Sequence, residues 1–350
     1  MDTESLQRNG RSRITLRDVA EAAGVSVQTV SNVVNGRADR MAPKTRARIE
    51  EVIDELRYHP NNAARGLRSS RTMTVAFIVL DAHSAFLADP LTDLLIAGVG
   101  DVALERGYGV LIQGARPGSR DRHLLAPLHE ARVDGAFVLL SGEPGTRREI
   151  LAELESIGKP FVVFDEHPTS DALLSVRADQ YTGAARLVEY LVGRGHRRIG
   201  FIAARVPWPV VEDRFAGYRD ALARADIPED VSLQRFEGKY QPDGGHRMMQ
   251  ELIDMAEPPT AVVCGSDLLA IGAIGSARQR GLRVPDDIAI CGFNDFTFAE
   301  FFEPPLTTVR VPGYEMGRAG ANMLLDRLDG RPHATEQIVF PVELRVRGSA

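Results

Sequence analysis

Apolar residues along the chain follow two different periods, and the change between them divides it into two parts. Residues 16–56 place apolar side chains three and four positions apart, as amphipathic helices do. From residue 73, short continuous apolar runs such as "TVAFIVL" and "DGAFVLL" alternate with helical stretches. This alternation is typical of parallel strands that are covered on both faces by helices. The pattern predicts a small helical head followed by a large α/β body.

Short polar residues mark where the helices of the head begin and end. Thr15 is expected to cap a first helix, with Asp18 completing a capping box and Gly24 ending the helix. Ser26 is expected to cap a second helix. A third helix should begin at Pro43, a residue that fits the first helical turn.

The body contains two sets of alternating strands and helices, each longer than 100 residues. We therefore predict two doubly wound, parallel-sheet subdomains with a cleft between them. The chain is expected to cross between the subdomains three times, near residues 178, 306 and 335. The predicted boundaries are a tail over 1–13, a head over 14–60, a linker over 61–72, and a body over 73–350 with a first subdomain at about 73–178 and 307–335 and a second at about 179–306 and 336–350.

Composition and charge indicate where the protein is located and which part of the chain is basic. The 350 residues are 44% hydrophobic and 26% charged, with no apolar run of membrane-spanning length and no apolar segment near the N-terminus. A cytoplasmic protein without a membrane partner is expected. Residues 1–70 carry a net charge of +3, whereas the whole chain carries −6. The basic head is therefore the part expected to meet a polyanion.

The cysteines and histidines point to no metal site or cofactor. Cys264 and Cys291 both lie in apolar runs, where buried free thiols are expected, although a disulfide between them stays open as an alternative. The histidines are scattered without metal-ligand spacing. The sequence "GVGDVA" at 98–103 matches a nucleotide-binding pattern that would favour an enzyme, but it lies in a helical apolar pattern instead of after a strand.

The stretch "VSVQTVSNVVNG" fits the second half of a helix-turn-helix. Ala20, Gly24 and Val30 occupy its small, turn and core positions. The second helix should then expose Val27, Gln28, Thr29, Ser31 and Asn32. Polar side chains at these positions can reach base edges in the major groove, and an adjacent apolar one can meet a thymine methyl. The alternative is a capped helix pair in a small bundle with no nucleic-acid role.

The head sequence "TLRDVAEAAGVSVQTVSNVVNG" resembles the DNA-binding head of the lactose-repressor (LacI/GalR) family, and "NNAARGLR" resembles its hinge. The body is similar to that family's periplasmic-binding-protein type core in "GHRRIGFIA", "RFAGYRDAL", "GSDLLAIGA", "ICGFND" and "PPLTTVR". The resemblance spans about residues 14–348. It implies a repressor, not an enzyme, that binds a palindromic double-stranded DNA operator as a homodimer and responds to a small molecule, usually a sugar or glycoside. The chain has no leucine heptads at its end, which favours a dimer over a tetramer.

The resemblance and the helix-turn-helix pattern together give the expected DNA contacts. Arg17, Lys44 and Arg46 are expected to contact phosphates, and Leu67 to insert into the minor groove as an apolar wedge, from a hinge that is helical only on DNA. The full set of expected DNA-binding residues is Thr15, Leu16, Arg17, Ser26, Val27, Gln28, Thr29, Ser31, Asn32, Asn35, Lys44, Arg46, Asn61, Ala64, Leu67 and Arg68.

The resemblance also implies an effector site in the cleft. Arg214 matches the family arginine that grips the effector, and its planar fork suits a bidentate contact. Alternatives stay open for three candidates: Asp267 could cap a helix, Tyr240 could be an ordinary tyrosine, and Trp208 could only pack locally. The expected effector residues are Asp89, Asp165, Trp208, Arg214, Tyr240, Ser266, Asp267, Asn294 and Asp295. A two-lobed sugar-binding protein of transport type and a nucleotide-binding enzyme are the rival functions.

Overall fold

The computed structural model describes residues 14–34, 41–58, 71–81, 86–115, 124–205, 208–238, 240–332 and 335–350. The chain divides into two compact units, Met1–Arg71 and Thr72–Ala350, and each is considered by itself. No helix in the described ranges combines the length and the apolar character needed to cross a membrane.

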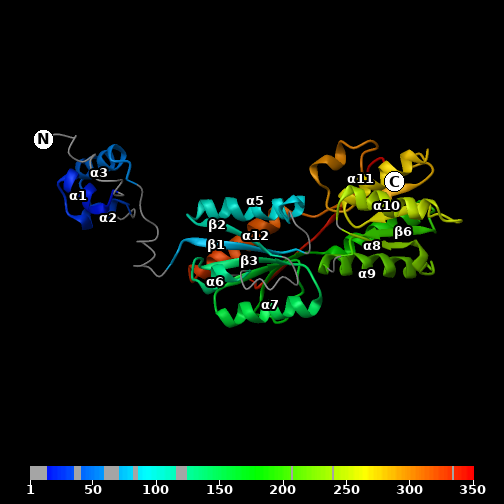
Figure 1. The fold of residues 1–350 in the computed structure, drawn as a ribbon, viewed down its shortest axis with the longest axis horizontal. Coiled ribbons are helices and arrows are strands. Elements are labelled where there is room, and N and C mark those ends of the chain that lie inside the picture. The colour runs from blue at the N-terminus through cyan, green and yellow to red at the C-terminus, as the bar shows by residue number, and fades with distance from the viewer. Residues whose placement is uncertain are drawn as a thin grey trace. The chain divides into compact units, whose positions relative to one another are not determined.

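The described part of the head holds three short helices around a small core (Figure 1). They are α1 (Leu16–Ala23), α2 (Val27–Val34) and α3 (Pro43–Glu55). The predicted capping box is confirmed, because the Thr15 N–H donates to Asp18 Oδ2 at 2.7 Å and the Asp18 N–H donates to Thr15 Oγ1 at 3.4 Å. Gly24 ends α1 with φ 66°, and the Ser26 side chain accepts the Thr29 N–H at 3.1 Å. The core of the head consists of Val19, Ala20, Ala23, Val30, Ile49, Val52 and Tyr58.

The first lobe of the body is a six-stranded, all-parallel sheet in the order β11-β5-β4-β3-β1-β2. Its strands are β1 (Thr74–Leu80), β2 (Gly109–Ala115), β3 (Gly135–Leu140), β4 (Phe161–Phe164), β5 (Leu174–Ala178) and β11 (Gln337–Phe340). Helices α5 (Pro90–Glu105) and α12 (Gly313–Leu328) pack on one face, and α6 (Ala126–His129) and α7 (Pro144–Ile157) pack on the other (Figure 1). The short 3₁₀ turn η2 (Phe86–Ala88) precedes α5.

The second lobe is a four-stranded parallel sheet in the order β7-β6-β8-β9. Its strands are β6 (Ile199–Ala203), β7 (Gln234–Phe236), β8 (Ala261–Cys264) and β9 (Ala289–Cys291). Helices α8 (Gln180–Gly193) and α9 (Pro209–Arg224) cover one face, and α10 (Pro242–Ile253) and α11 (Asp267–Gln279) cover the other. The 3₁₀ turns η3 (Val231–Leu233) and η4 (Thr297–Glu300) complete the lobe.

Both cysteines are buried and free, as expected. Cys264 belongs to the apolar cluster beneath α10 and α11, whereas Cys291 belongs to the cluster on the opposite face of the sheet. A disulfide between them would have to pass through the sheet, so the structure excludes that alternative.

The glycines of "GVGDVA" lie inside α5, which confirms the helical interpretation of this stretch. A Cβ at Gly98 would collide with the Tyr314 carbonyl oxygen of α12. This glycine therefore serves the close packing of two helices, and the pattern has no link to nucleotide binding.

In the part of the body that the structure describes, three crossover segments connect the lobes, and two of them lie later in the chain than predicted. The first is at Ala178–Gln180, as expected. The second follows β10 (Thr308–Arg310), which pairs with β12 (Glu343–Arg345) and bridges to Asn294 of the second lobe. The third follows β11, which pairs with β5 of the first lobe. The boundaries expected at 306 and 335 are therefore about five residues early. Of the two strands that precede these crossovers, β10 is mostly buried and β11 is half-exposed.

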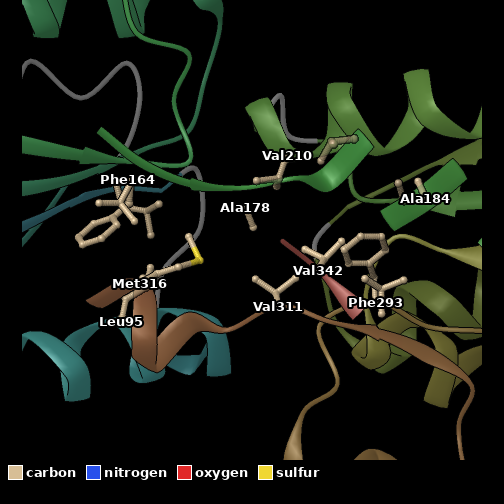
Figure 2. Close-up of a cluster of buried hydrophobic side chains, with 14 of the residues drawn as sticks. Leu95, Phe164, Ala178, Ala184, Val210, Phe293, Val311, Met316 and Val342 are labelled. Atoms are coloured by element: carbon tan, nitrogen blue, oxygen red, sulfur yellow. The ribbon is translucent and has the colours of Figure 1, made fainter. Parts of the chain in front are cut away.

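One apolar cluster runs through the crossovers into both lobes. Figure 2 shows Ala178, Val311 and Val342, one from each crossover region, between side chains of the two lobes. Leu95, Phe164 and Met316 lie on the first-lobe side, and Ala184 and Phe293 lie on the second-lobe side. The junction of the lobes is therefore a packed apolar core and not only a set of linkers.

The packing of α10 against α11 gives a test of the fold. Gly272 lies where a Cβ would collide with the Pro242 carbonyl oxygen, whereas Gly275 in the same helix has open space. We expect Gly272→Ala to lower the free energy of unfolding by about 1–3 kcal/mol through overpacking. Gly275→Ala should leave it unchanged or raise it by about 0.5–1 kcal/mol, because alanine favours the helix. Chemical denaturation measures both, and equal effects of the two substitutions would contradict this packing.

Candidate DNA-binding face and ligand cavity

The exposed side of α2 carries three of the predicted base-reading residues. Val27 is 41% exposed, Gln28 is exposed, and Asn32 is half-exposed. The Gln28 Nε2 donates to Asn32 Oδ1 at 3.1 Å, across one turn of the helix. We call Val27, Gln28 and Asn32 the reading face. This hydrogen bond joins the two amide side chains of the reading face.

Two other residues that were expected to be exposed for base contacts are partly or fully buried. Ser31 is only 9% exposed, so the expectation that α2 presents it is wrong. It lies on the side of the helix that also carries Val34 and packs into the head. Thr29 is half-buried, and its hydroxyl lies 2.7 Å from the Ser26 hydroxyl in the cap of α2.

The other residues expected to contact DNA differ in their exposure and in their role within the head. Thr15 and Ser26 act as helix caps, and Leu16 packs against the core of the head. Arg17, Lys44 and Arg46 are exposed, as phosphate-binding residues must be, and Arg46 forms an ion pair with Glu50 at 2.7 Å. Asn35, Asn61, Ala64, Leu67 and Arg68 lie outside the described residues.

A cavity between the two lobes gathers seven of the nine predicted effector residues. Its volume is about 30 Å³, far below the roughly 300–1,000 Å³ of small-molecule pockets. The lobes are therefore closed around a space that holds only a few water molecules. The lining residues are Asp89, Leu91, Thr92, Leu139, Asp165, Trp208, Val210, Arg214, Tyr240, Ser266 and Asn294.

Arg214 of α9 is the central charged group of the cavity, and it is only 2% exposed. Its Nε donates to Gln180 Oε1 at 2.9 Å, its Nη1 to the Gly265 carbonyl at 2.6 Å, and its Nη2 to Asn294 Oδ1 at 2.9 Å. The guanidinium also stacks 3.9 Å above the Phe293 ring. A guanidinium has five N–H groups, so these three bonds leave two hydrogens for a ligand.

Two carboxylates of the first lobe face this arginine across the cavity. Asp89 caps α5 by accepting the Leu91 N–H at 2.9 Å, and Asp165 accepts the Ala178 N–H at 3.1 Å. Burial raises the pKa of both groups, that of Asp165 to about 6, against the opposing effect of these bonds and of the Arg214 charge. Each carboxylate has a second oxygen that can accept a hydrogen bond from a ligand hydroxyl.

The aromatic and hydroxyl residues complete the lining. The Tyr240 hydroxyl is buried without a hydrogen-bond partner among the residues that the structure describes, and burial raises its pKa to about 12. Trp208 directly precedes α9 and packs on the apolar cluster of the two lobes. The Ser266 hydroxyl accepts the Leu268 N–H at 3.2 Å and so caps α11.

Two predicted effector residues do not line the cavity. Asp267 is fully buried, accepting the Phe296 N–H at 2.8 Å and the Thr308 hydroxyl at 2.5 Å, so its role is structural. Ser266, and not Asp267, is the cap of α11.

Asp295 lies outside the cavity because the backbone turns at this point. It forms an ion pair with Arg347 at 2.7 Å, in a separate polar hollow. Asn294 and Asp295 have φ of 109° and 56°, so the alternation of a strand does not continue through them. Asn294 consequently faces the cavity while its neighbour does not.

Four lining residues were missed by sequence reasoning. Thr92 is buried one turn after Asp89 in α5, and this helical spacing could have pointed to it. Leu91, Leu139 and Val210 are apolar residues in apolar segments, where no sequence signal separates a cavity wall from an ordinary core position.

Comparisons with known proteins identify the family of the head and of the body. Residues 15–61 match the family of bacterial regulatory proteins of the lacI type, and residues 188–350 match the periplasmic binding protein-like domain. The transcriptional regulator CelR of Thermobifida fusca is 36% identical over 97% of this chain and 99% of its own length. The transcriptional repressor CytR of Escherichia coli K12 is 34% identical over 96% of both chains.

The chain belongs to the lacI family of bacterial regulatory proteins. It is a DNA-binding transcriptional regulator, and the family comprises regulators and not enzymes. Both rival functions are thereby excluded.

Solved structures confirm the predicted fold class. The chain is similar to a CelR–cellobiose complex, with a TM-score of 0.72 and 34% identity over 97% of this chain and all of that one. It is also similar to the Lac repressor dimer bound to operator and an anti-inducer, with a TM-score of 0.85 and 26% identity over 97% and 99% of the two chains.

Asp267 gives a prediction about pH. Burial raises its pKa from 3.8 to about 7. A carboxyl with a raised pKa in the folded state stabilises the fold while it is protonated, and this contribution is lost as the pH rises toward that pKa. The free energy of unfolding of Asp267→Asn, relative to wild type, should therefore increase between pH 4 and pH 7. Chemical denaturation across this range measures it, with the exposed Asp171→Asn as control. A pH-independent difference would show that Asp267 titrates normally.

Proposed function

We propose that the protein is a cytoplasmic repressor that binds a palindromic operator as a homodimer and is controlled by a sugar or glycoside. The observation that supports this most directly is the combination of two sites in one chain. An amide-bearing reading face stands on a capped helix of the head, and a cavity with acceptors, an arginine and aromatic residues lies between two lobes.

The reading face supports sequence-specific binding in the major groove. Glutamine and asparagine can each bond adenine bidentately, and the Val27 methyls can contact a thymine methyl. Exposed Arg17 and Lys44 supply phosphate contacts that position the helix. The proposed hinge over residues 61–68 would add a minor-groove wedge at Leu67 when two copies meet at the centre of the operator.

The cavity supports a polyhydroxylated, uncharged effector. Asp89 and Asp165 offer carboxylate oxygens to hydroxyl donors, and Arg214 retains two N–H groups for hydroxyl oxygens. Trp208 and Tyr240 provide apolar surface of the kind that covers a sugar ring. Because the relative CelR has been solved with cellobiose, a disaccharide glucoside is the first effector to test.

The small cavity means that the lobes must separate to admit such a ligand. His167 of the first lobe lies 3.0 Å from Asp213 on α9, so separation breaks this contact. Ligand and operator then couple by selecting different lobe arrangements, and the coupling is reciprocal. A change from mostly bound to mostly free requires about 5.5 kcal/mol of differential affinity.

Selection of bound duplexes from a random DNA library tests the operator proposal. Purified protein should enrich a palindrome, and no enriched sequence would contradict the proposal. Gln28→Ala should relax the preference at one position per half-site, because a bidentate contact is worth about 1–3 kcal/mol of discrimination. Fluorescence anisotropy with single-base operator variants measures this, with Glu51→Ala as an exposed control on α3. An equal loss on all variants would mean that Gln28 only positions the helix.

The Tyr240 hydroxyl tests the effector proposal. Removing an unpaired buried hydroxyl should leave stability unchanged or raise it, since such a group costs about 1–3 kcal/mol. Tyr240→Phe should nevertheless weaken sugar binding about tenfold if this hydroxyl bonds the ligand. Thermal shifts with a carbohydrate panel that begins with cellobiose measure both quantities. Tyr190→Phe is the control, because its hydroxyl donates to the Ala350 carbonyl at 2.8 Å. An unchanged sugar midpoint in Tyr240→Phe would place the ligand elsewhere.

A further inference from the structure

The first crossover is held from both lobes by residues that line the cavity. Asp165 of the first lobe accepts the Ala178 N–H at 3.1 Å, where β5 ends. Arg214 of the second lobe donates to Gln180 Oε1 at 2.9 Å, where α8 begins. The three residues from Ala178 to Gln180 are therefore fixed at one end by an acidic cavity residue and at the other by a basic one.

Gln180 itself does not line the cavity, and no motif pointed to it. It is 1% exposed and is the first residue of α8. Its side chain also lies beside Asp165, and its Nε2 is buried without a hydrogen-bond partner among the residues that the structure describes. Gln180 thus bonds the positive charge of the cavity and lies beside a negative one, at the point where the chain passes from one lobe to the other.

Hydrogen bonds also connect the other two crossovers to the first crossover and to the cavity. The Asp179 N–H donates to the Phe340 carbonyl at 3.0 Å, which joins the first crossover to the third. The cavity residue Asn294 donates its N–H to the Val309 carbonyl at 2.8 Å and accepts the Val311 N–H at 3.2 Å, which joins it to the second. Arg214 bonds both Gln180 and Asn294, so one side chain connects to all three crossovers.

Dense packing leaves little room for these bonds to adjust gradually. Gly183, in the first turn of α8, lies so close to Phe293, Val309 and Val342 that a Cβ would contact all three within 3.0 Å. Packed junctions of this kind change between discrete arrangements and do not deform continuously. A movement of Arg214 is therefore expected to be passed to the crossovers through its hydrogen bonds.

We propose that Gln180 is a positioning residue for the effector response, which joins Arg214 to the first crossover and so links the cavity to the angle between the lobes. Its regulatory meaning rests on the proposed function. The structural link itself does not, because it is a property of the free protein.

The test uses hydrogen–deuterium exchange on the full-length protein without DNA or sugar. Gln180→Met removes the acceptor for Arg214 at similar length, Gln180→Glu retains an oxygen at that position, and Gln279→Met is an exposed control at the end of α11. Exchange is followed in peptides that cover residues 174–183 and 337–343, and in β3 (Gly135–Leu140) as a reference for global opening.

We expect Gln180→Met to accelerate exchange at the crossover peptides about tenfold, since a hydrogen bond to a charged group is worth about 1.5–3 kcal/mol. Exchange in β3 should not change, and Gln180→Glu and Gln279→Met should remain within about threefold of wild type at all peptides. Equal acceleration in β3 would show a general packing role and overturn the proposal. So would unchanged exchange in Gln180→Met, or equal acceleration in Gln180→Met and Gln180→Glu. None of these outcomes depends on the effector or the operator. Failure of this proposal can therefore be distinguished from failure of the proposed function.

Discussion

Burial of the Arg214 guanidinium is the constraint around which the second lobe is organised. A buried charge is tolerated only when its donors are bound, and here the acceptors come from three separate places: the start of α8, the end of β8 and the loop after β9. The Phe293 ring supplies a face for the cation at 3.9 Å. The strand ends must therefore converge on α9, and this convergence forms one wall of the cavity.

The opposite wall of the cavity carries negatively charged groups instead of a positive one. Asp89 and Asp165 are held by backbone N–H groups at 2.9 Å and 3.1 Å and not by a cation. Their carboxylates remain available as acceptors, and burial without a direct counter-ion raises their pKa. The cavity thus separates donors on one lobe from acceptors on the other, and a ligand that offers both is needed to satisfy the two walls together.

Sequence reasoning could locate the elements of the site better than the direction of individual side chains. The alternation of apolar runs and helices predicted both lobes, and strand ends pointed to Ser266 and Asn294. The same rule chose Asp295 wrongly, because positive φ values at Asn294 and Asp295 redirect the chain. Ser31 was misplaced because the neighbouring helices decide which side of α2 is covered. No sequence signal pointed to Gln180, since its partner Arg214 is 34 residues away and meets it only in the fold.

The three crossovers have a consequence for the order in which the protein can form during synthesis. The first lobe lacks its edge strand and one covering helix until β11 and α12 have been made, and these lie at residues 313–340, after the whole second-lobe sheet. Domains usually fold as units while the chain emerges from the ribosome. Here a nascent chain that stops before residue 313 would expose the apolar face of β3 and β4 where α12 packs, including Phe137 and Phe164. The sheet that is translated first is therefore the one that must wait longest for its complete core, and in this interval the growing chain is most exposed to aggregation and to chaperones.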